Sequence, residues 1–243
     1  MARDWDAEEY DRLPIPMTGW GKAVVDRLAL EGNERVLDAG CGTGQVTARL
    51  LERLPRGEVV ALDGSPSMIA RARERLGADR VTYLVADLLD PLPIAPLDAI
   101  VSTATFHWIT DHGRLFTNLA AVLRAGGRLA AQCGGSGNIA NLTAVVATFG
   151  YDLTRDKIFP EPAETAQRLH AAGFTEIECW ISSAPATVPR EDLESYLRTV
   201  CMGGIVDGLP REEADDLVRA VAAAMPEPWI DYVRLNIGAR RAG

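Results

Sequence analysis

Short apolar runs of strand length recur through the first half of the chain. They span residues 34–39, 58–62, 81–85, 97–102 and 127–133. Within each run the apolar residues are continuous rather than alternating, a pattern typical of strands that are covered on both faces. We therefore expect these runs to form the inner strands of a sheet with helices packed against both sides.

Segments with helical periodicity lie between these runs and predict helices over 43–53, 66–76 and 111–124. The second helix has a clear start at Ser65-Pro66, because serine is a favoured N-cap residue and proline is favoured at the first helical position. The regular alternation of strands and helices predicts a parallel α/β sheet wrapped by helices.

The later half of the chain departs from this alternation. Its pattern predicts a helix over 164–172, an edge strand over 174–181 and a helical block over 190–225, and strand character returns at 229–241. We expect one domain over residues 1–243. Its expected parts are an N-terminal helical cap over 1–30, a core over 31–182, a helical insertion over 186–228 that covers the site, and a last strand over 229–243.

Composition and charge narrow the possible partners. The chain has 243 residues, of which 47% are hydrophobic, and its formal net charge is −9. Nucleic acids and anionic membranes attract clustered Lys and Arg, so an acidic chain favours a small-molecule partner. The opening MARDWDAEEYD lacks an apolar signal segment, and no run approaches about eighteen apolar residues, which predicts a cytoplasmic protein. The four cysteines lie far apart without a C-x-x-C pair, so neither a metal site nor a disulfide framework is expected.

The stretch DAGCGTG, residues 38–44, places three glycines directly after the first predicted strand. In a parallel sheet, ligands bind beyond the carboxyl ends of the strands, at the point where the strand order reverses. Glycine permits a positive φ and lets a ligand approach the backbone, while the amides that begin the next helix face the ligand. Gly40, Gly42 and Gly44 therefore predict a cofactor site.

Three acidic residues follow three successive strands and indicate which ligand this loop binds. Asp63 comes 23 positions after Gly40, near the spacing of about 20 at which an acid binds ribose hydroxyls. Asp38 and Asp87 follow the first and third strands. The glycine spacing is G-x-G-x-G rather than the G-x-G-x-x-G of dinucleotide sites, and an acid at the loop repels a pyrophosphate. S-adenosylmethionine carries an ammonium and a sulfonium, so it suits this set of acceptors.

At these motifs the sequence resembles the class I methyltransferases over nearly its whole length. The stretches that carry the resemblance are VLDAGCGTG, ALDGSPSMIARAR, ADLLD and the long run from LDAIVSTATFHW to GGRLAAQ. The resemblance implies a Rossmann-like seven-stranded sheet, mostly parallel with an antiparallel last strand, helical caps, and S-adenosylmethionine as cofactor. The cofactor-binding residues that it implies are Asp38, Gly40, Cys41, Gly42, Gly44, Asp63, Gly64, Met68, Asp87, Leu88 and Thr103.

Other stretches are similar to a narrower group, the trans-aconitate and malonyl carrier-protein methyltransferases. Among them are TFHWITDHGRLFTNLAAVLRAGG and FPEPAETAQRLHAAGFTEIE. Both kinds of enzyme are carboxyl O-methyltransferases, so the resemblance implies O-methylation of a carboxylate by in-line displacement. A carboxylate is ionised at neutral pH and needs no base, whereas a phenol or an acidic carbon needs one.

The role of His107, which follows the fourth predicted strand, would distinguish these acceptors. If His107 is a general base, the acceptor is a phenol, a hydroxyl or a carbon atom. If it is a hydrogen-bond donor, it orients a carboxylate. A purely structural role in the loop is the third alternative. His112 and His170 fall within predicted helices and are expected at the surface. The residues expected to line an apolar acceptor pocket are Tyr10, Trp20, Phe106, Trp108 and Tyr196.

The charge of the insertion bears on the choice of partner. Four arginines against nine acids give residues 190–228 a net charge of −5, which opposes docking of an acidic carrier protein. A tricarboxylate acceptor needs several converging cations, for which Arg12 and Arg198 are the candidates. A less polar small acid or a natural-product hydroxyl fits as well. Two other classes of function stay open, a cofactor-binding module without catalysis and a nicotinamide oxidoreductase.

Overall fold

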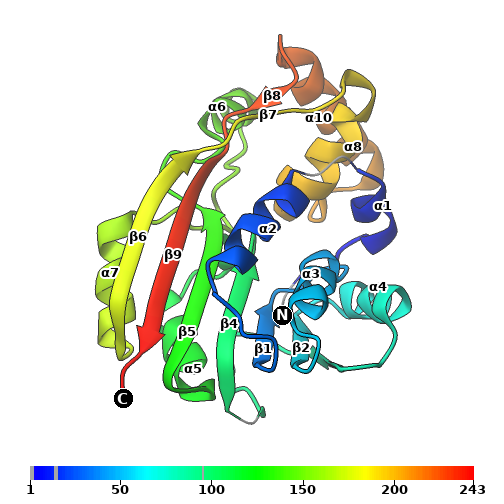
Figure 1. The fold of residues 1–243 in the computed structure, drawn as a ribbon. Coiled ribbons are helices and arrows are strands. Elements are labelled where there is room, and N and C mark those ends of the chain that lie inside the picture. Colours follow the sequence, from blue (N-terminus) through cyan, green and yellow to red (C-terminus); the bar gives the residue numbers. More distant parts are fainter. Residues whose placement is uncertain (1–2, 14–15, 95) are drawn as a thin grey trace.

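The apolar runs form neighbouring strands of one sheet, whose order in the described part of the chain is β3-β2-β1-β4-β5-β9-β6 (Figure 1). This computed structural model describes residues 3–13, 16–94 and 96–243. The strands of the sheet are β1 (Arg35–Ala39), β2 (Glu58–Asp63), β3 (Val81–Val85), β4 (Leu97–Thr103), β5 (Leu123–Gly134), β6 (Phe174–Ser183) and β9 (Val233–Arg241). β6 lies at an edge of the sheet, as its alternating pattern predicts.

Strand direction confirms the predicted topology. Within this sheet β9 runs antiparallel between β5 and β6, and the other strands run parallel to one another. The chain moves outward from β1 through β2 to β3, returns to β4 on the other side of β1 and continues to β5. β1 and β4 therefore flank the point at which the strand order reverses, where sheets of this kind bind ligands.

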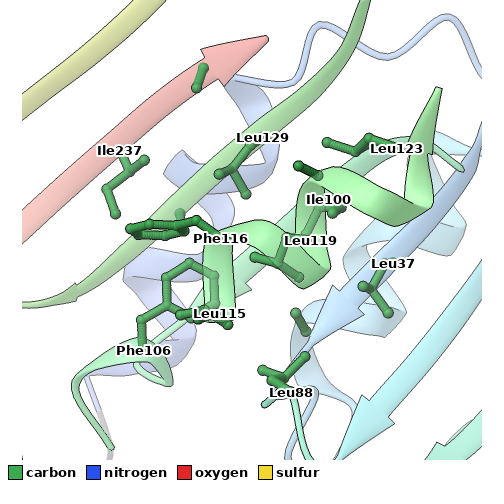
Figure 2. Close-up of a cluster of buried hydrophobic side chains, with 14 of the residues drawn as sticks. Leu37, Leu88, Ile100, Phe106, Leu115, Phe116, Leu119, Leu123, Leu129 and Ile237 are labelled. Carbon is green, nitrogen blue, oxygen red and sulfur yellow. The ribbon is translucent and has the colours of Figure 1, made fainter. Parts of the chain in front are cut away.

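Helices cover both faces of the sheet, which explains the continuous apolar runs. Successive residues of a strand point to opposite faces, so Val36 and Leu37 enter different cores although both are fully buried. Leu37 belongs to the cluster that includes Phe116 and Leu119 (Figure 2). Val36 packs on the other face with Leu50. A polar residue at either position would face a core.

The helices are α1 (Ala7–Arg12), α2 (Met17–Asp26), α3 (Gln45–Arg53), α4 (Pro66–Leu76), α5 (His112–Val122), α6 (Ala140–Thr148), α7 (Pro162–Ala171), α8 (Leu193–Tyr196), α9 (Gly203–Val206) and α10 (Arg211–Ala224), with short turns η1 (Phe106–Trp108), η2 (Arg190–Asp192) and η3 (Leu197–Cys201). α4 has the predicted bounds, and the Ser65 hydroxyl caps it by accepting the N–H of Met68 at 3.3 Å. α6 lies in a segment for which the pattern predicts no element. None of the helices in the described ranges is long and apolar enough to cross a lipid bilayer.

The helical block α8–α10 lies beyond the carboxyl ends of the parallel strands (Figure 1) and shares an apolar core with α6. A short antiparallel ribbon joins it to the sheet, formed by β7 (Ala186–Thr187) and β8 (Trp229–Ile230). The N-terminal helix α1 contacts η3 of this block. Helix α1 and the helical block therefore meet at one end of the molecule.

Two predictions about aromatic rings are wrong. Phe106, expected in the acceptor pocket, is fully buried in the core, where its ring centroid lies 6.0 Å from that of Phe116 (Figure 2). His112, expected at the surface, is buried, and its Nε2 lies 2.9 Å from the carbonyl oxygen of Phe106. The short turn η1 directs Phe106 toward α5, and the ring of His112 packs against the same Phe116 with centroids 5.4 Å apart. His170 is exposed, as expected.

Phe106→Ala should lower the free energy of unfolding by about 3–5 kcal/mol, because it removes a fully buried ring and leaves a cavity. Unfolding in guanidinium chloride measures this change. Val85→Ala is the matched control, since Val85 is 49% exposed and its loss should change stability by no more than about 0.5 kcal/mol. Equal small losses in the two variants would contradict the placement of Phe106 in the core.

Candidate active site

A cleft of about 490 Å³ opens where the parallel strands end, and its volume is typical of small-molecule sites. Its walls come from the ends of β1, β2, β3 and β4 and the segments that follow them, from the N-terminal residues Arg3, Trp5 and Tyr10, and from Asp156. The predicted cofactor-binding residues that line it are Gly40, Gly42, Asp63, Gly64, Met68, Asp87, Leu88 and Thr103. Most of the predicted set therefore meets at the point where the strand order reverses.

The loop after β1 presents its backbone to this cleft. Gly40 and Gly42 have φ values of +82° and +53°, a left-handed conformation that favours glycine. A Cβ at Gly40 would overlap the side chain of Thr105, whereas a Cβ at Gly42 would meet open space. The N–H groups of Gly40 and Cys41 donate to the carbonyl oxygen of Leu62 at 2.8 and 2.9 Å. The neighbouring strand β2 thus determines the shape of the loop.

Asp63 and Asp87 place carboxylates at the cleft. Asp63 accepts hydrogen bonds from the backbone N–H groups of Gly42 and Ser65, both at 2.9 Å. Its burial nevertheless raises its pKa, and a ligand that donates to this carboxylate would favour the charged form. Asp87 accepts the N–H of Leu89 at 2.9 Å. Each carboxylate keeps further lone pairs, which suits donors such as ribose hydroxyls and an exocyclic amine.

Three predicted cofactor residues, Asp38, Cys41 and Gly44, do not line the cleft. Asp38 is fully buried and accepts the hydroxyl of Thr47 at 2.7 Å, while its Oδ1 has no hydrogen-bond partner among the described residues. Burial raises the pKa of Asp38 to about 7, and a cation brought to this loop would favour its ionised form. Cys41 is buried. Gly44 allows close packing on α4, since a Cβ there would lie 2.9 Å from Leu76 Cδ1.

A smaller inner cavity of about 50 Å³ adjoins the cleft and shares with it Trp5, Tyr10, Ala104 and Trp108. Its other lining residues are His107, Asn138, Ile139, Lys157, Phe159, Val200, Cys201, Tyr232 and Arg234. Tyr10 and Trp108, both predicted to contact the acceptor, therefore stand at the junction of the two cavities. The position beside the cofactor cleft makes the inner cavity the candidate acceptor pocket.

Two buried cations lie at the inner cavity. Arg234 is 1% exposed, and its Nε and Nη2 have no hydrogen-bond partner in the described part of the chain. Its guanidinium lies 4.6 Å from the ring centroid of Trp20, and burial lowers its pKa. Lys157 Nζ donates to the carboxylate of Asp156 at 2.8 Å and lies 4.5 Å from the ring centroid of Trp108. Asp156 balances the charge of Lys157, so the unpaired positive charge at the pocket is that of Arg234, which keeps unused donors.

Two other residues predicted for the acceptor pocket lie behind its wall. Trp20 packs on Tyr232, with ring centroids 5.3 Å apart, and on Arg234. Tyr196 is fully buried in the helical block, and its hydroxyl lies 2.6 Å from that of Tyr232. Neither residue lines the cleft or the inner cavity. Trp20 and Tyr196 therefore pack against residues that line the pocket, whereas the sequence predicted that they contact the acceptor directly.

Sequence reasoning missed the cations of this pocket. The expected candidates, Arg12 and Arg198, pair instead with Glu9 and with an acid of α10, and line neither cavity. Lys157 lies in a segment where the pattern predicts no element. For Arg234 a signal was available, because it is a lone cation between apolar neighbours in the predicted last strand, and buried charges are rare unless paired.

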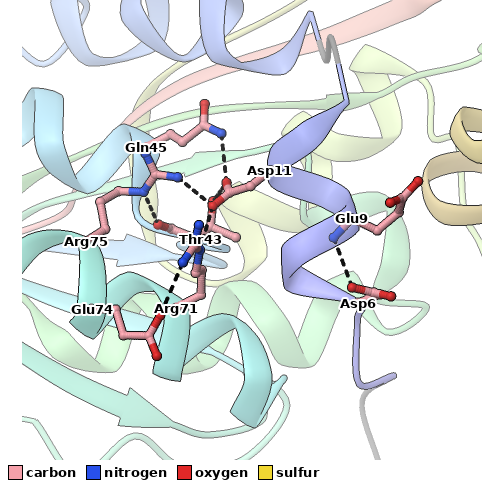
Figure 3. Close-up of polar contacts among 8 residues, drawn as sticks. All are labelled: Asp6, Glu9, Asp11, Thr43, Gln45, Arg71, Glu74 and Arg75. Atoms are coloured by element: carbon pink, nitrogen blue, oxygen red, sulfur yellow. Dashed lines mark hydrogen bonds and ion pairs between the residues drawn. The ribbon is translucent and has the colours of Figure 1, made fainter. Parts of the chain in front are cut away.

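The carboxylate of Asp11 helps to hold the N-terminal segment in place over the cleft. Asp11 of α1 accepts hydrogen bonds from Thr43 Oγ1 at 2.6 Å, Arg71 Nε at 2.9 Å and Arg75 Nη2 at 2.6 Å (Figure 3). Thr43 belongs to the glycine loop and the two arginines belong to α4, so Asp11 ties α1 to both elements. α1 also carries Tyr10, which lines both cavities. The Asp11 contacts therefore hold part of the aromatic wall in place.

Comparison with known sequences identifies the family. A family profile described as a methyltransferase domain matches residues 36–127. The chain is 32% identical to a trans-aconitate 2-methyltransferase from Methylobacterium nodulans, and the alignment covers 98% of each chain. It is 38% identical to a trans-aconitate 2-methyltransferase from an Azoarcus species, over 53% of this chain and 50% of that one.

Solved structures show the same fold. A mycolic acid cyclopropane synthase in complex with S-adenosylhomocysteine has a TM-score of 0.65 at 13% identity, covering 98% of this chain and 96% of that one. Phosphoethanolamine N-methyltransferase 2 from Haemonchus contortus, in complex with S-adenosylmethionine, has a TM-score of 0.62 at 21% identity, covering 93% of this chain and 53% of that one.

The chain belongs to the class I S-adenosylmethionine-dependent methyltransferases. It is an enzyme with S-adenosylmethionine as its cofactor, which sets aside the nicotinamide oxidoreductase and the non-catalytic module. The residues at the cleft fit this cofactor, because a Cβ at Gly42 would meet open space and the carboxylates of Asp63 and Asp87 are acceptors suited to ribose hydroxyls and an exocyclic amine. The unpartnered oxygen of Asp38, beneath the same loop, fits a ligand that carries positive charge.

Asp63→Ala should weaken the binding of S-adenosylhomocysteine by about 1.5–3 kcal/mol, because it removes a charged acceptor at the cleft. Isothermal titration calorimetry measures the loss. Asp90→Ala is the matched control, since Asp90 is exposed, pairs with Arg114 and does not line the cleft. Unchanged affinity in Asp63→Ala would remove Asp63 from the cofactor site.

Asp11→Asn should speed the release of S-adenosylhomocysteine about 5- to 30-fold. The variant replaces a carboxylate bonded to two arginines by a neutral amide, at a cost of roughly 1–2 kcal/mol. Stopped-flow tryptophan fluorescence follows the release, since Trp5 and Trp108 line the cleft. Glu8→Gln, on the exposed side of the same helix, should release the ligand at the wild-type rate, and equal rates in all three proteins would contradict the role given to Asp11.

Proposed function

We propose that this enzyme transfers the methyl group of S-adenosylmethionine to a carboxylate oxygen of a small organic acid. The observation that carries the proposal is the buried guanidinium of Arg234, whose Nε and Nη2 lack partners among the described residues. A buried charge without a partner is costly, and an anionic ligand in the inner cavity would supply one. A guanidinium presents parallel N–H donors that match the two oxygens of a carboxylate.

The likeness to trans-aconitate 2-methyltransferase supports an acid as the acceptor. That relative aligns with almost the whole chain, and its name gives an acid as its substrate. Lys157 also lines the inner cavity, and although its ammonium is paired with Asp156, it adds a polar donor group beside Arg234. The volume of about 50 Å³ limits the part of the acceptor that enters this cavity to a short group.

A carboxylate acceptor requires little from the protein beyond position. S-adenosylmethionine supplies an electrophilic methyl group when it is bound. A carboxyl group has a pKa near about 4 and is ionised at neutral pH, so no side chain has to remove a proton before transfer. The remaining task is to hold the acceptor oxygen in line and to exclude water, and Trp5, Tyr10 and Trp108 enclose the junction of the two cavities.

A phenol, hydroxyl or carbon acceptor is the alternative, and it requires a base. His107 is the candidate base at the inner cavity. Its burial, together with the charges of Arg234 and Lys157, lowers its pKa well below the ordinary value, and a lower pKa weakens a base. The unpaired charge of Arg234 favours an anionic acceptor, so the charge of the pocket supports the acid over the phenol.

The purified enzyme should release S-adenosylhomocysteine with small carboxylic acids and not with phenols of similar size. In Arg234→Met the KM for the best acid should rise about 10- to 100-fold, because methionine keeps much of the volume but none of the charged donors. Affinity for S-adenosylhomocysteine should stay at the wild-type value. Arg240→Met is the matched control, since Arg240 lies on the same strand but is exposed and pairs with Glu176.

Stability provides a second readout for Arg234→Met. Loss of an unpartnered buried charge should leave the free energy of unfolding of the ligand-free protein unchanged or raise it. A raised KM with undiminished stability would therefore assign Arg234 to the acceptor rather than to the fold. Turnover of phenols alone, at the same rate in Arg234→Met and in the wild type, would overturn the proposal.

A further inference from the structure

The His107 ring is held in one orientation at the wall of the inner cavity. It stacks with the ring of Phe159 at 6.0 Å between centroids, and its centroid lies 5.2 Å from that of Trp108. The carbonyl oxygen of His107 accepts the N–H of Ile158 at 2.9 Å, so the backbone is fixed as well. The side chain is buried but lines the cavity. Nδ1 of the ring lies 3.4 Å from the backbone nitrogen of Gly134 in β5, which leaves the edge that carries Nε2 for the cavity.

The backbone of β5 determines which nitrogen carries the proton. The N–H of Gly134 donates to Nδ1 of His107 across 3.4 Å. A backbone N–H is a donor only, so Nδ1 must present its lone pair, and a neutral ring then carries its proton on Nε2. The polar group that His107 offers to an acceptor is thus the N–H of Nε2.

The groups packed around His107 keep the ring neutral. Burial is the largest cause of its lowered pKa, and Arg234 of β9 and Lys157 of the segment after α6 add positive charge. His112 of α5 also has a lowered pKa because of burial. Cys133 of β5 stays a thiol, since burial raises its pKa to about 12. The other titratable groups lining the cavity, Tyr10, Cys201 and Tyr232, are neutral because burial raises their pKa values.

We propose that His107 is a neutral hydrogen-bond donor, through Nε2–H, that orients the acceptor oxygen for methyl transfer and does not act as a base. The proposal rests on the proposed function in that the acceptor enters the inner cavity. In the transfer a lone pair of the carboxylate oxygen forms the new O–CH3 bond and the electron pair of the S–CH3 bond stays on sulfur. No proton moves, so His107 keeps its proton throughout.

A neutral donor has an advantage over a further cation at this position. Methyl transfer discharges the carboxylate, so a second full positive charge on the reacting oxygen, in addition to that of Arg234, would stabilise the reactants more than the transition state. A fixed N–H dipole orients the oxygen without that penalty, and the ring contacts with Trp108 and Phe159 mean that it needs no rearrangement.

The protonation state is measurable without an acceptor. The chain has three histidines, so long-range 1H–15N correlation spectra, assigned with His107→Gln and His170→Gln, resolve the ring of His107. The ring should show the neutral form with the proton on Nε2 from about pH 6 to pH 8, a range in which an ordinary histidine titrates. A proton on Nδ1, or an imidazolium that forms within this range, would overturn the proposal.

Kinetics of two amide variants test which ring nitrogen of His107 contacts the acceptor. The side-chain amide nitrogen of glutamine reaches about as far as Nε2, whereas that of asparagine reaches about as far as Nδ1. With an acid acceptor, His107→Gln should keep kcat/KM within about 5-fold of the wild type, whereas His107→Asn and His107→Leu should lose about 10- to 100-fold. The wild-type rate should be flat over the same pH range. Equal losses in all three variants, with a wild-type rate that rises through the pH range in which histidine titrates, would indicate a base. Unchanged rates in all variants would indicate a structural role. Either result would overturn the proposal.

Failure of this proposal is distinguishable from failure of the proposed function. If no carboxylic acid is turned over, the proposed function fails, and the spectra still decide the state of His107. If acids are turned over and glutamine rescues no better than asparagine, the proposal for His107 fails while the acid acceptor stands.

Discussion

The parallel strands end at one edge of the sheet, and this shared edge determines where every functional group lies. The loop after β1 is held there by the N–H groups of Gly40 and Cys41, which donate to the carbonyl oxygen of Leu62 at the end of β2. Asp63 then accepts the N–H of Gly42, so the acid at the end of β2 supports the loop that follows β1. The cofactor cleft therefore depends on the pairing of β1 with β2, and the inner cavity, the candidate acceptor pocket, is built against it by segments from the N-terminal and C-terminal parts of the chain.

Much of the fold was predictable because its physical causes are local or periodic. Continuous apolar runs arise when both faces of a strand are covered, and Val36 and Leu37 show this by entering opposite cores. Ser65 and Pro66 begin α4 at the expected residue because capping involves only neighbours in sequence. The cofactor side was predictable for the related reason that Gly40, Asp63 and Asp87 each follow a strand, and strand ends of a parallel sheet converge.

The acceptor side was less predictable because its contacts are long-range. Phe106 and His107 are adjacent, yet one enters the core and the other the pocket, and the direction of a short turn leaves no periodic signal. Lys157 comes from a segment without a predicted element, and the role of Arg234 depends on which residues face it from other segments. Trp20 and Tyr196 were misplaced for a similar reason. An apolar pattern does not distinguish residues that line a pocket from residues that pack behind them.

The inner cavity draws most of its lining from outside residues 36–127, the part that matches the methyltransferase family profile. Asn138, Lys157, Phe159 and Arg234 lie after that part, and Trp5 and Tyr10 lie before it. Substitutions in the segments after residue 127 would alter the inner cavity while the glycine loop and its acids keep their contacts. A chain organised in this way can acquire a new acceptor during evolution, or in a designed library, with its methyl donor site left intact.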